Sequence, residues 1–239
     1  MKKILPFGLL LGFLLIFSAT VQAQNLEGTW ERSGKFGDKE ITYVMMVSGN
    51  FFSWTAFYSG DGAFIATKGG SLKASKNELV YMYEFDTADS SMVGQTEKHA
   101  MSLKGKTLTL DNNYKWKRTD AGKSSPLNGA WLISGRKRNG EITKRSTDGP
   151  RKTMKILTPT RFQWIAFNTA TKQFMGTGGG SYTAENGKYI ENIEFFSRDN
   201  SRVGASLDFN FEVIDGDWHH SGNSSKGKPI YEVWSIRTK

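Results

Sequence analysis

The sequence predicts an all-β protein built from two tandem antiparallel up-and-down β-barrels, and three observations lead to this prediction. The chain repeats itself, because residues 52–94 align without a gap to residues 162–204, and 16 of the 43 aligned residues are identical. Short alternating runs of aromatic and β-branched residues, separated by Gly, Asn and Asp clusters, occur throughout. No long segment carries apolar residues at i, i+3, i+4 and i+7, the spacing of an amphipathic helix.

The repeat defines the expected domains. The first copy covers residues 25–120 and the second covers residues 127–239, with the small, polar, proline-ended segment AGKSSP (121–126) as a linker. A period of about 100 residues is too long for a solenoid or propeller unit, so each copy is a complete domain. We therefore expect residues 127–239 to fold when expressed alone.

Each copy is expected to contain about eight strands. Turn clusters such as Ser48-Gly49-Asn50 separate them, and in the first copy the strands are predicted at 28–34, 41–48, 51–58, 63–74, 78–86, 96–104, 106–111 and 113–119. Strands joined by hairpins form an antiparallel meander, and closing it into a barrel removes exposed edges. A β-sandwich is the alternative.

Period-2 alternation separates the two faces of the repeated aromatic strand. Phe52, Trp54 and Ala56 lie on one face, and the same residue types recur at positions 162, 164 and 166. The face that both copies share is the predicted barrel interior.

A tryptophan and an arginine at opposite ends of each copy resemble the lipocalin pattern, in which a Trp near the barrel base packs under an Arg of the last strand. The first copy has Gly28-x-Trp30 with Arg118, and the second has Gly129-x-Trp131 with Arg237. The longer run from Arg161 to Trp234 resembles a family of exported bacterial lipocalin-like domains of unknown function. The resemblance implies a calycin-type barrel and brings no chemistry with it.

Residues 1–23 have the features of a secretory signal peptide. Lys2 and Lys3 precede an uncharged apolar run, and small residues at Val21 and Ala23 favour cleavage near Ala23-Gln24. The apolar run is shorter than the roughly 20 residues that span a bilayer, which disfavours the alternative of an uncleaved anchor. We expect a secreted or periplasmic protein without a transmembrane segment after cleavage.

The composition indicates how the chain is stabilised and which kind of partner its charge attracts. The chain has no cysteine, so burial of apolar surface must stabilise it, and 13% of its residues are aromatic. The formal charge of +9 includes Lys2 and Lys3, which leaves +7 for the mature chain. A positive balance attracts anionic partners, although an exported protein is not expected to bind nucleic acid.

Candidate ligand-binding residues lie on the predicted strands of both copies. Glu191 and Glu194 fall on opposite faces, and at most one of His219 and His220 can enter the barrel. A carboxylate that points into the barrel must be paired with a cation or must have a raised pKa, and a raised pKa is typical of functional sites. The alternative is that these Glu and His side chains face solvent and have no role in binding. The predicted ligand-binding residues are Trp164, Glu191, Glu194, Trp218 and His220 in the second copy and Trp54, Tyr81 and Tyr83 in the first.

Two further features distinguish the copies or suggest other chemistry. Gly178-Gly179-Gly180 lacks the G-x-G-x-x-G spacing and a following helix, so it indicates a bulge or close backbone approach rather than a phosphate cradle.

The second copy has nine extra residues between its first two conserved tryptophans, and seven basic residues lie there between Arg136 and Lys152. No catalytic residue, metal site or cofactor is predicted.

The sequence favours non-catalytic binding of a small apolar or amphipathic ligand by a monomeric exported protein. The basic insertion predicts an anionic group on the ligand and places polar recognition in residues 127–239, with the first copy serving as structure or as an apolar pocket. Two alternatives remain open. One is a structural or envelope-interaction module with solid barrels, and the other is an enzyme that uses Glu191 or Glu194 with a His of the second copy.

Overall fold

The computed structural model describes residues 26–120, 124–224 and 227–238, so the predicted signal peptide and residues 121–123 of the linker lie outside the described residues. No helix in this part of the chain is long and apolar enough to cross a membrane. The described residues form strands and two single 3-10 turns. In chain order these are β1 (Gly28–Phe36), β2 (Lys39–Ser48), β3 (Phe51–Tyr58), β4 (Phe64–Ala74), β5 (Glu78–Asp86), η1 (Ser90–Met92), β6 (Thr96–Lys104), β7 (Thr107–Leu110), β8 (Tyr114–Arg118), β9 (Gly129–Arg138), β10 (Glu141–Lys144), β11 (Arg151–Leu157), β12 (Arg161–Asn168), β13 (Gln173–Glu185), β14 (Lys188–Phe196), η2 (Asn200–Arg202), β15 (Ser206–Ile214), β16 (Asp217–Asn223) and β17 (Pro229–Ile236).

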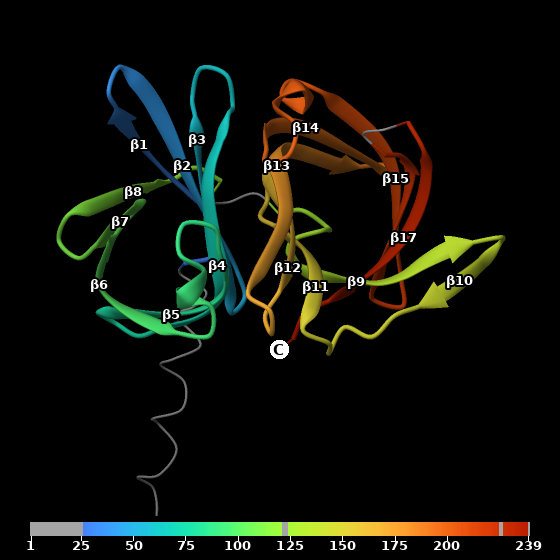
Figure 1. Cartoon of the computed structure of the whole chain (residues 1–239), viewed down its shortest axis with the longest axis horizontal. Helices are drawn as coiled ribbons and strands as arrows, with labels where there is room; N and C mark the ends of the chain where they lie inside the picture. Colours follow the sequence, from blue (N-terminus) through green and yellow to red (C-terminus); the bar gives the residue numbers. More distant parts are fainter. Residues whose placement is uncertain (1–25, 121–123, 225–226, 239) are drawn as a thin grey trace, which may run out of the picture.

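The first barrel follows the predicted meander. Strands β1 to β8 pair in sequence order, and Trp30 opposite Arg118 closes β8 onto β1 (Figure 1). Each of the eight strands overlaps the range expected from alternation and turn residues. The prediction of tandem antiparallel barrels is confirmed, and the sandwich alternative is wrong.

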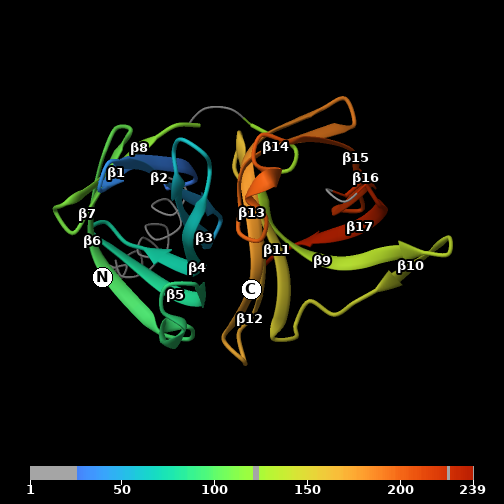
Figure 2. The same ribbon diagram turned by 45° about the horizontal axis from the view of Figure 1, so that its top comes forward.

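The second barrel contains one strand more than the first. Strands β9 and β11 to β17 form the closed barrel, with β9 paired to β17, while β10 pairs only with the outer half of β9. The β9–β10 hairpin projects away from the barrel wall (Figures 1 and 2). The nine-residue insertion therefore divides the equivalent of β2 into a projecting strand, a loop and β11.

The two conserved tryptophans occupy the same place in both barrels. Trp30 and Trp131 are buried, and each indole Nε1 donates a 2.9 Å hydrogen bond to the carbonyl oxygen of a leucine four residues earlier, Leu26 or Leu127. In the first barrel the Arg118 guanidinium lies 4.4 Å above the Trp30 ring, as the lipocalin pattern implies.

The closing arginine of the second copy has a different role from the expected one. Arg237 reaches the first barrel, where it donates to both oxygens of Glu84 at 2.5 and 2.7 Å and lies over Phe51. A carboxylate offers a guanidinium two parallel hydrogen bonds, which accounts for this geometry. The repeated Trp–Arg pattern of the second copy thus contributes to contact between the barrels.

The two faces of the repeated aromatic strand pack in two different apolar cores. Phe52 and Phe162 pack inside their own barrels, which confirms the predicted interior face. Phe57 and Phe167, on the outward face, belong instead to an apolar cluster between the barrels. This double burial explains why β3 and β12 are aromatic on both faces.

The contact between the barrels has approximate twofold symmetry. Phe57 stacks on Phe195 with ring centroids 5.1 Å apart, and their repeat equivalents Phe167 and Phe85 pack at 4.9 Å. Phe64 likewise stacks on its own equivalent, Phe174. Reciprocal contacts of this kind are the signature of an isologous interface, so the chain resembles a symmetric dimer joined into one polypeptide.

Candidate functional site

The interior of the second barrel holds a pocket of about 370 Å³. Its walls are mainly apolar, and they include Trp164, Phe196, Phe209 and Trp234. Charged side chains reach it from several strands, namely Arg136, Arg151, Lys155, Glu191, Arg198 and Glu232, together with His220. The volume lies within the range of about 300–1,000 Å³ that is usual for small-molecule sites.

A buried ion pair lies in this pocket. Lys155 Nζ on β11 donates to Glu191 Oε1 on β14 at 2.8 Å, and both side chains are 6% exposed. The ammonium group lies 4.9 to 5.9 Å from the ring centroids of four aromatic residues, Tyr189, Phe209, Trp218 and Trp234. Burial, followed by the charge of Glu191, raises the pKa of Tyr189 well above its usual value.

The first barrel has uncharged residues at the equivalent positions. Lys155 pairs with Trp131 and Trp164 on the neighbouring strands, just as Met45 pairs with Trp30 and Trp54. Tyr81 corresponds to Glu191, and its hydroxyl contacts the Met45 sulfur at 3.4 Å. The barrel therefore folds with an uncharged pair here, and the Lys155–Glu191 pair is particular to the second copy.

A second polar pair lies across the pocket. His220 is 2% exposed, and its Nδ1 lies 3.7 Å from Glu232 Oε2, while Arg136 donates to Glu232 Oε1 at 3.1 Å. Burial, followed by the nearby Lys155 charge, lowers the pKa of His220, which favours the neutral imidazole. Burial alone would raise the pKa of Glu232, but contact with His220 and the charges of Lys155 and Arg136 lower it.

Several buried polar atoms in and beside this pocket have no hydrogen-bond partner within the described part of the chain. In the lining they are the indole Nε1 of Trp234 and both ring nitrogens of His220, and in the adjoining core they are the Trp218 Nε1 and the Tyr189 hydroxyl. Buried donors and acceptors are normally hydrogen-bonded, so atoms of this kind call for a ligand or water as partner.

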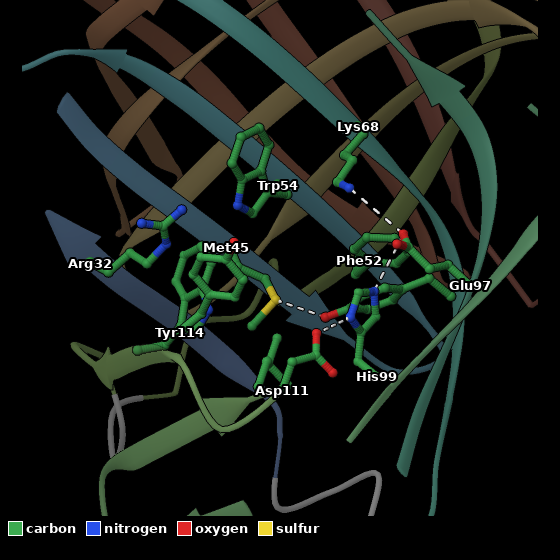
Figure 3. Close-up of a pocket in the computed structure, with 12 residues that line it drawn as sticks. Arg32, Met45, Phe52, Trp54, Lys68, Glu97, His99, Asp111 and Tyr114 are labelled. Atoms are coloured by element: carbon green, nitrogen blue, oxygen red, sulfur yellow. Dashed lines mark hydrogen bonds and ion pairs between the residues drawn. The ribbon is translucent and has the colours of Figure 1, made fainter. Parts of the chain in front are cut away.

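The first barrel also contains a pocket of about 370 Å³, shown in Figure 3. Aromatic residues line it, but so do two cations, Arg32 and Lys68, and two carboxylates, Glu97 and Asp111. The first copy was expected to serve as structure or as an apolar pocket, and its pocket carries these charged side chains beside the apolar ones.

The polar groups of the first barrel form a chain along β5, β6 and the end of β7. The Tyr83 hydroxyl donates to Glu97 Oε2, which lies 3.4 Å from His99 Nε2, and His99 Nδ1 lies 2.7 Å from Asp111 Oδ2. Lys68 Nζ is 3.9 Å from the same Glu97 oxygen (Figure 3). Burial would raise the pKa of Glu97, but the Tyr83 hydrogen bond and the neighbouring His99 and Lys68 lower it.

The structure brings together five of the eight predicted site residues in pockets. Trp164, Glu191 and His220 line the second-barrel pocket, and Trp54 and Tyr81 line that of the first barrel. Tyr83 reaches the first pocket through Glu97, whereas Trp218 is packed in the core. Glu194 lies away from the second pocket and accepts from Arg161, which also donates to Glu31 of the first barrel.

Sequence reasoning missed Lys155 and the group around His99. Extending the repeat alignment upstream in the same frame would have placed Lys155 opposite Met45, on the predicted inward face. The sequence does not reveal the contact between His99 and Asp111, because Asp111 follows β7. Only the β6–β7 hairpin brings its side chain to His99 on β6.

Comparison with known proteins gives this chain no family. No protein-family model matches the sequence, and no match is found among curated proteins. The described residues contain no group of three or more His, Cys, Asp or Glu side chains that could hold a metal ion. The closed antiparallel barrels are consistent with a lipocalin-like fold, and the functional argument rests on the two pockets.

Proposed function

We propose that this protein is an exported lipocalin-like binding protein, and that its second barrel binds a small amphipathic molecule with an anionic group without catalysis. The observation that carries the proposal is the combination of apolar walls with Arg136, Arg151 and Arg198 in one pocket. Four cationic and two anionic side chains line the pocket, so the balance favours an anion.

The arrangement gives the ligand a defined orientation. Arg151 is exposed and lines the pocket, and its side chain has no hydrogen bond or ion pair within the described residues, so it is available to an anionic group at the pocket entrance. The apolar part of the ligand would contact Trp164, Phe196 and Phe209. Arginine suits this role because its planar fork matches a carboxylate or phosphate.

The deeper part of the pocket adds a requirement for polarity. A purely apolar tail here would leave the buried ring nitrogens of His220 without hydrogen-bond partners, which costs free energy. The ligand therefore carries at least one hydrogen-bonding group at its far end, such as a hydroxyl or carbonyl.

The two alternatives receive less support. Solid barrels would leave no room for ligand, whereas each barrel has an interior pocket. The enzyme alternative combines Glu191 or Glu194 with a histidine of the second copy, yet Glu191 is paired with Lys155 and Glu194 with Arg161.

The experiment is a titration of the mature chain with an anionic fluorescent fatty-acid analogue that carries a mid-chain hydroxyl, alongside its uncharged alcohol counterpart. We expect the anion to bind more tightly at low salt and the preference to weaken at 1 M salt, where the Debye length is about 3 Å. Arg151→Gln should lower affinity for the anion by about tenfold, the equivalent of one charge-assisted hydrogen bond. Lys188→Gln, which removes an equally positive but distant side chain, is the control. Equal binding of anion and alcohol would refute the proposal.

A further inference from the structure

The first-barrel pocket differs in chemistry from that of the second barrel. Its charged lining is balanced, with Arg32 and Lys68 against Glu97 and Asp111, so it has no overall preference for an anion or a cation. The charges are also separated in space, because Arg32 lies across the pocket from the Glu97, His99 and Asp111 group (Figure 3). A ligand must therefore offer different groups to the two sides.

Arg32 has no anionic partner among the described residues. Its guanidinium lies 3.7 Å above the Tyr43 ring and 5.1 to 5.2 Å from the rings of Trp116 and Tyr114, and its buried Nε has no hydrogen-bond acceptor. Stacking on aromatic rings fixes the plane of the guanidinium and leaves its N–H groups available in the pocket. An arginine held in this way fits a carboxylate.

The opposite side offers fixed acceptors and one donor. Tyr83, His99 and Lys68 all contact Oε2 of Glu97, and within the described residues no hydrogen bond reaches its Oε1. Asp111 is held by His99 and by the Ala100 backbone N–H at 3.0 Å. The side chains of Lys68, Glu97 and Asp111 are 33%, 40% and 41% exposed, so a ligand can reach them.

The walls between these two sides are flat and aromatic. Phe52, Trp54 and Trp116 line the pocket together with Tyr81 and Tyr114. A fatty acid would fit these walls, but its tail would desolvate Glu97 and Asp111 without giving them partners. A simple cation would face Arg32 and Lys68.

We propose that the first barrel is a separate binding site for an acidic sugar, a hexuronic acid. The carboxylate would bind Arg32, ring hydroxyls would donate to Glu97 Oε1 and Asp111 and accept from Lys68, and the apolar C–H face of the ring would lie against the aromatic wall. The pocket of about 370 Å³, equal in volume to that of the second barrel, has room for one sugar ring, and its lining rather than its volume favours a sugar. The proposal does not depend on the function proposed for the second barrel.

The test is isothermal titration of the mature protein with glucuronate, galacturonate and mannuronate, each alongside its uncharged uronamide and the parent hexose. We expect saturable binding of at least one uronate, and about tenfold weaker binding of its uronamide, because the carboxylate loses its charge-assisted pair with Arg32. Comparable affinity for acid and amide, or no saturable binding of any of the three uronates, would overturn the proposal whatever happens to the variants.

Variants place the site in the first barrel. Arg32→Gln should remove the preference for acid over amide, whereas Lys98→Gln, a cation on β6 whose side chain is 71% exposed, should keep it. Binding of the fatty-acid analogue should be unchanged in Arg32→Gln, which separates this site from the second-barrel pocket. A preference for the acid that persists in Arg32→Gln would contradict the assignment.

Discussion

At the scale of the residue, the two barrels differ in charge at a pair of inward positions. The first barrel has Met45 and Tyr81 there, and the second has Lys155 and Glu191. A buried ion pair loses hydration free energy that its Coulombic attraction often fails to recover, and apolar replacements are commonly neutral or stabilising. The pair in the second barrel is therefore better explained by ligand recognition than by stability.

Substitution of one member of the Lys155–Glu191 pair should lower the free energy of unfolding, whereas substitution of both members should not. Lys155→Met leaves Glu191 buried without its partner, and we expect a loss of about 3–5 kcal/mol in the free energy of unfolding. Lys155→Met with Glu191→Tyr restores the first-barrel pair and should recover most of that loss, while ligand affinity stays low. Urea unfolding of the single and double variants measures this. A double variant no more stable than Lys155→Met would contradict the structural equivalence.

His220 should make stability depend on pH. Its pKa in the folded protein is lowered from the usual 6.5, so between its folded pKa and pH 6.5 the unfolded chain binds more protons than the folded one. The contribution of neutral His220 is complete above pH 6.5 and declines as the pH falls below that value. Thermal unfolding from pH 8 to pH 5 should show a fall that His220→Phe reduces and His219→Gln leaves unchanged. An identical fall in His220→Phe would show that other groups cause it.

At the scale of the element, alternation and turn residues were sufficient to predict the first-barrel strands. Clusters such as Ser48-Gly49-Asn50 end strands because glycine and asparagine tolerate turn conformations, and Gly49 has φ +58°. The separate strand β10 could not be predicted, since its residues lie in the insertion and its pairing with Gly135–Arg138 is decided in three dimensions. The charged pockets could not be predicted either, because the residues that line them come from separate strands and meet only in the folded barrel.

Glycine in β4 and β13 allows the strands to bulge. Pairing shifts register between Gly69 and Gly70 and between Gly179 and Gly180, and a Cβ at Gly180 would overlap the Asn192 carbonyl oxygen. This agrees with the structural interpretation of the glycine run.

Gly180→Ala should therefore destabilise the protein by about 1–3 kcal/mol or more, the usual cost of overpacking. Gly149→Ala, where a Cβ would meet nothing within 4 Å, is the matched control and should be close to neutral. Chemical unfolding of both variants gives the comparison. A neutral Gly180→Ala would mean that the bulge is not required.

At the scale of the whole molecule, the barrels share a third apolar core. Twelve buried residues form it, five from the first barrel and seven from the second. The sequence showed the repeat, but it could not show that the outward aromatic residues Phe57 and Phe167 meet the other copy, because alternation alone does not distinguish an interface from a solvent-facing surface. Polar groups complete the contact, since Gln163 Nε2 donates to Thr67 and to its equivalent Thr177, each at 3.0 Å.

The approximate twofold symmetry predicts how one barrel behaves alone. A fragment of residues 127–239 would expose Ile165, Phe167 and Phe195, an apolar surface that a second copy can cover through the same reciprocal contacts. We expect the fragment to fold, as the repeat predicts, and to form a dimer at micromolar concentrations. Size-exclusion chromatography with light scattering measures its mass, and near-UV circular dichroism reports its packing. Phe167→Asp should make the fragment monomeric, because it places a charge in the contact, whereas Lys188→Gln, at an exposed side chain outside the shared apolar cluster, should not. A folded, monomeric fragment with the native sequence would show that the contact between barrels in the intact chain depends on the linker rather than on complementary surfaces.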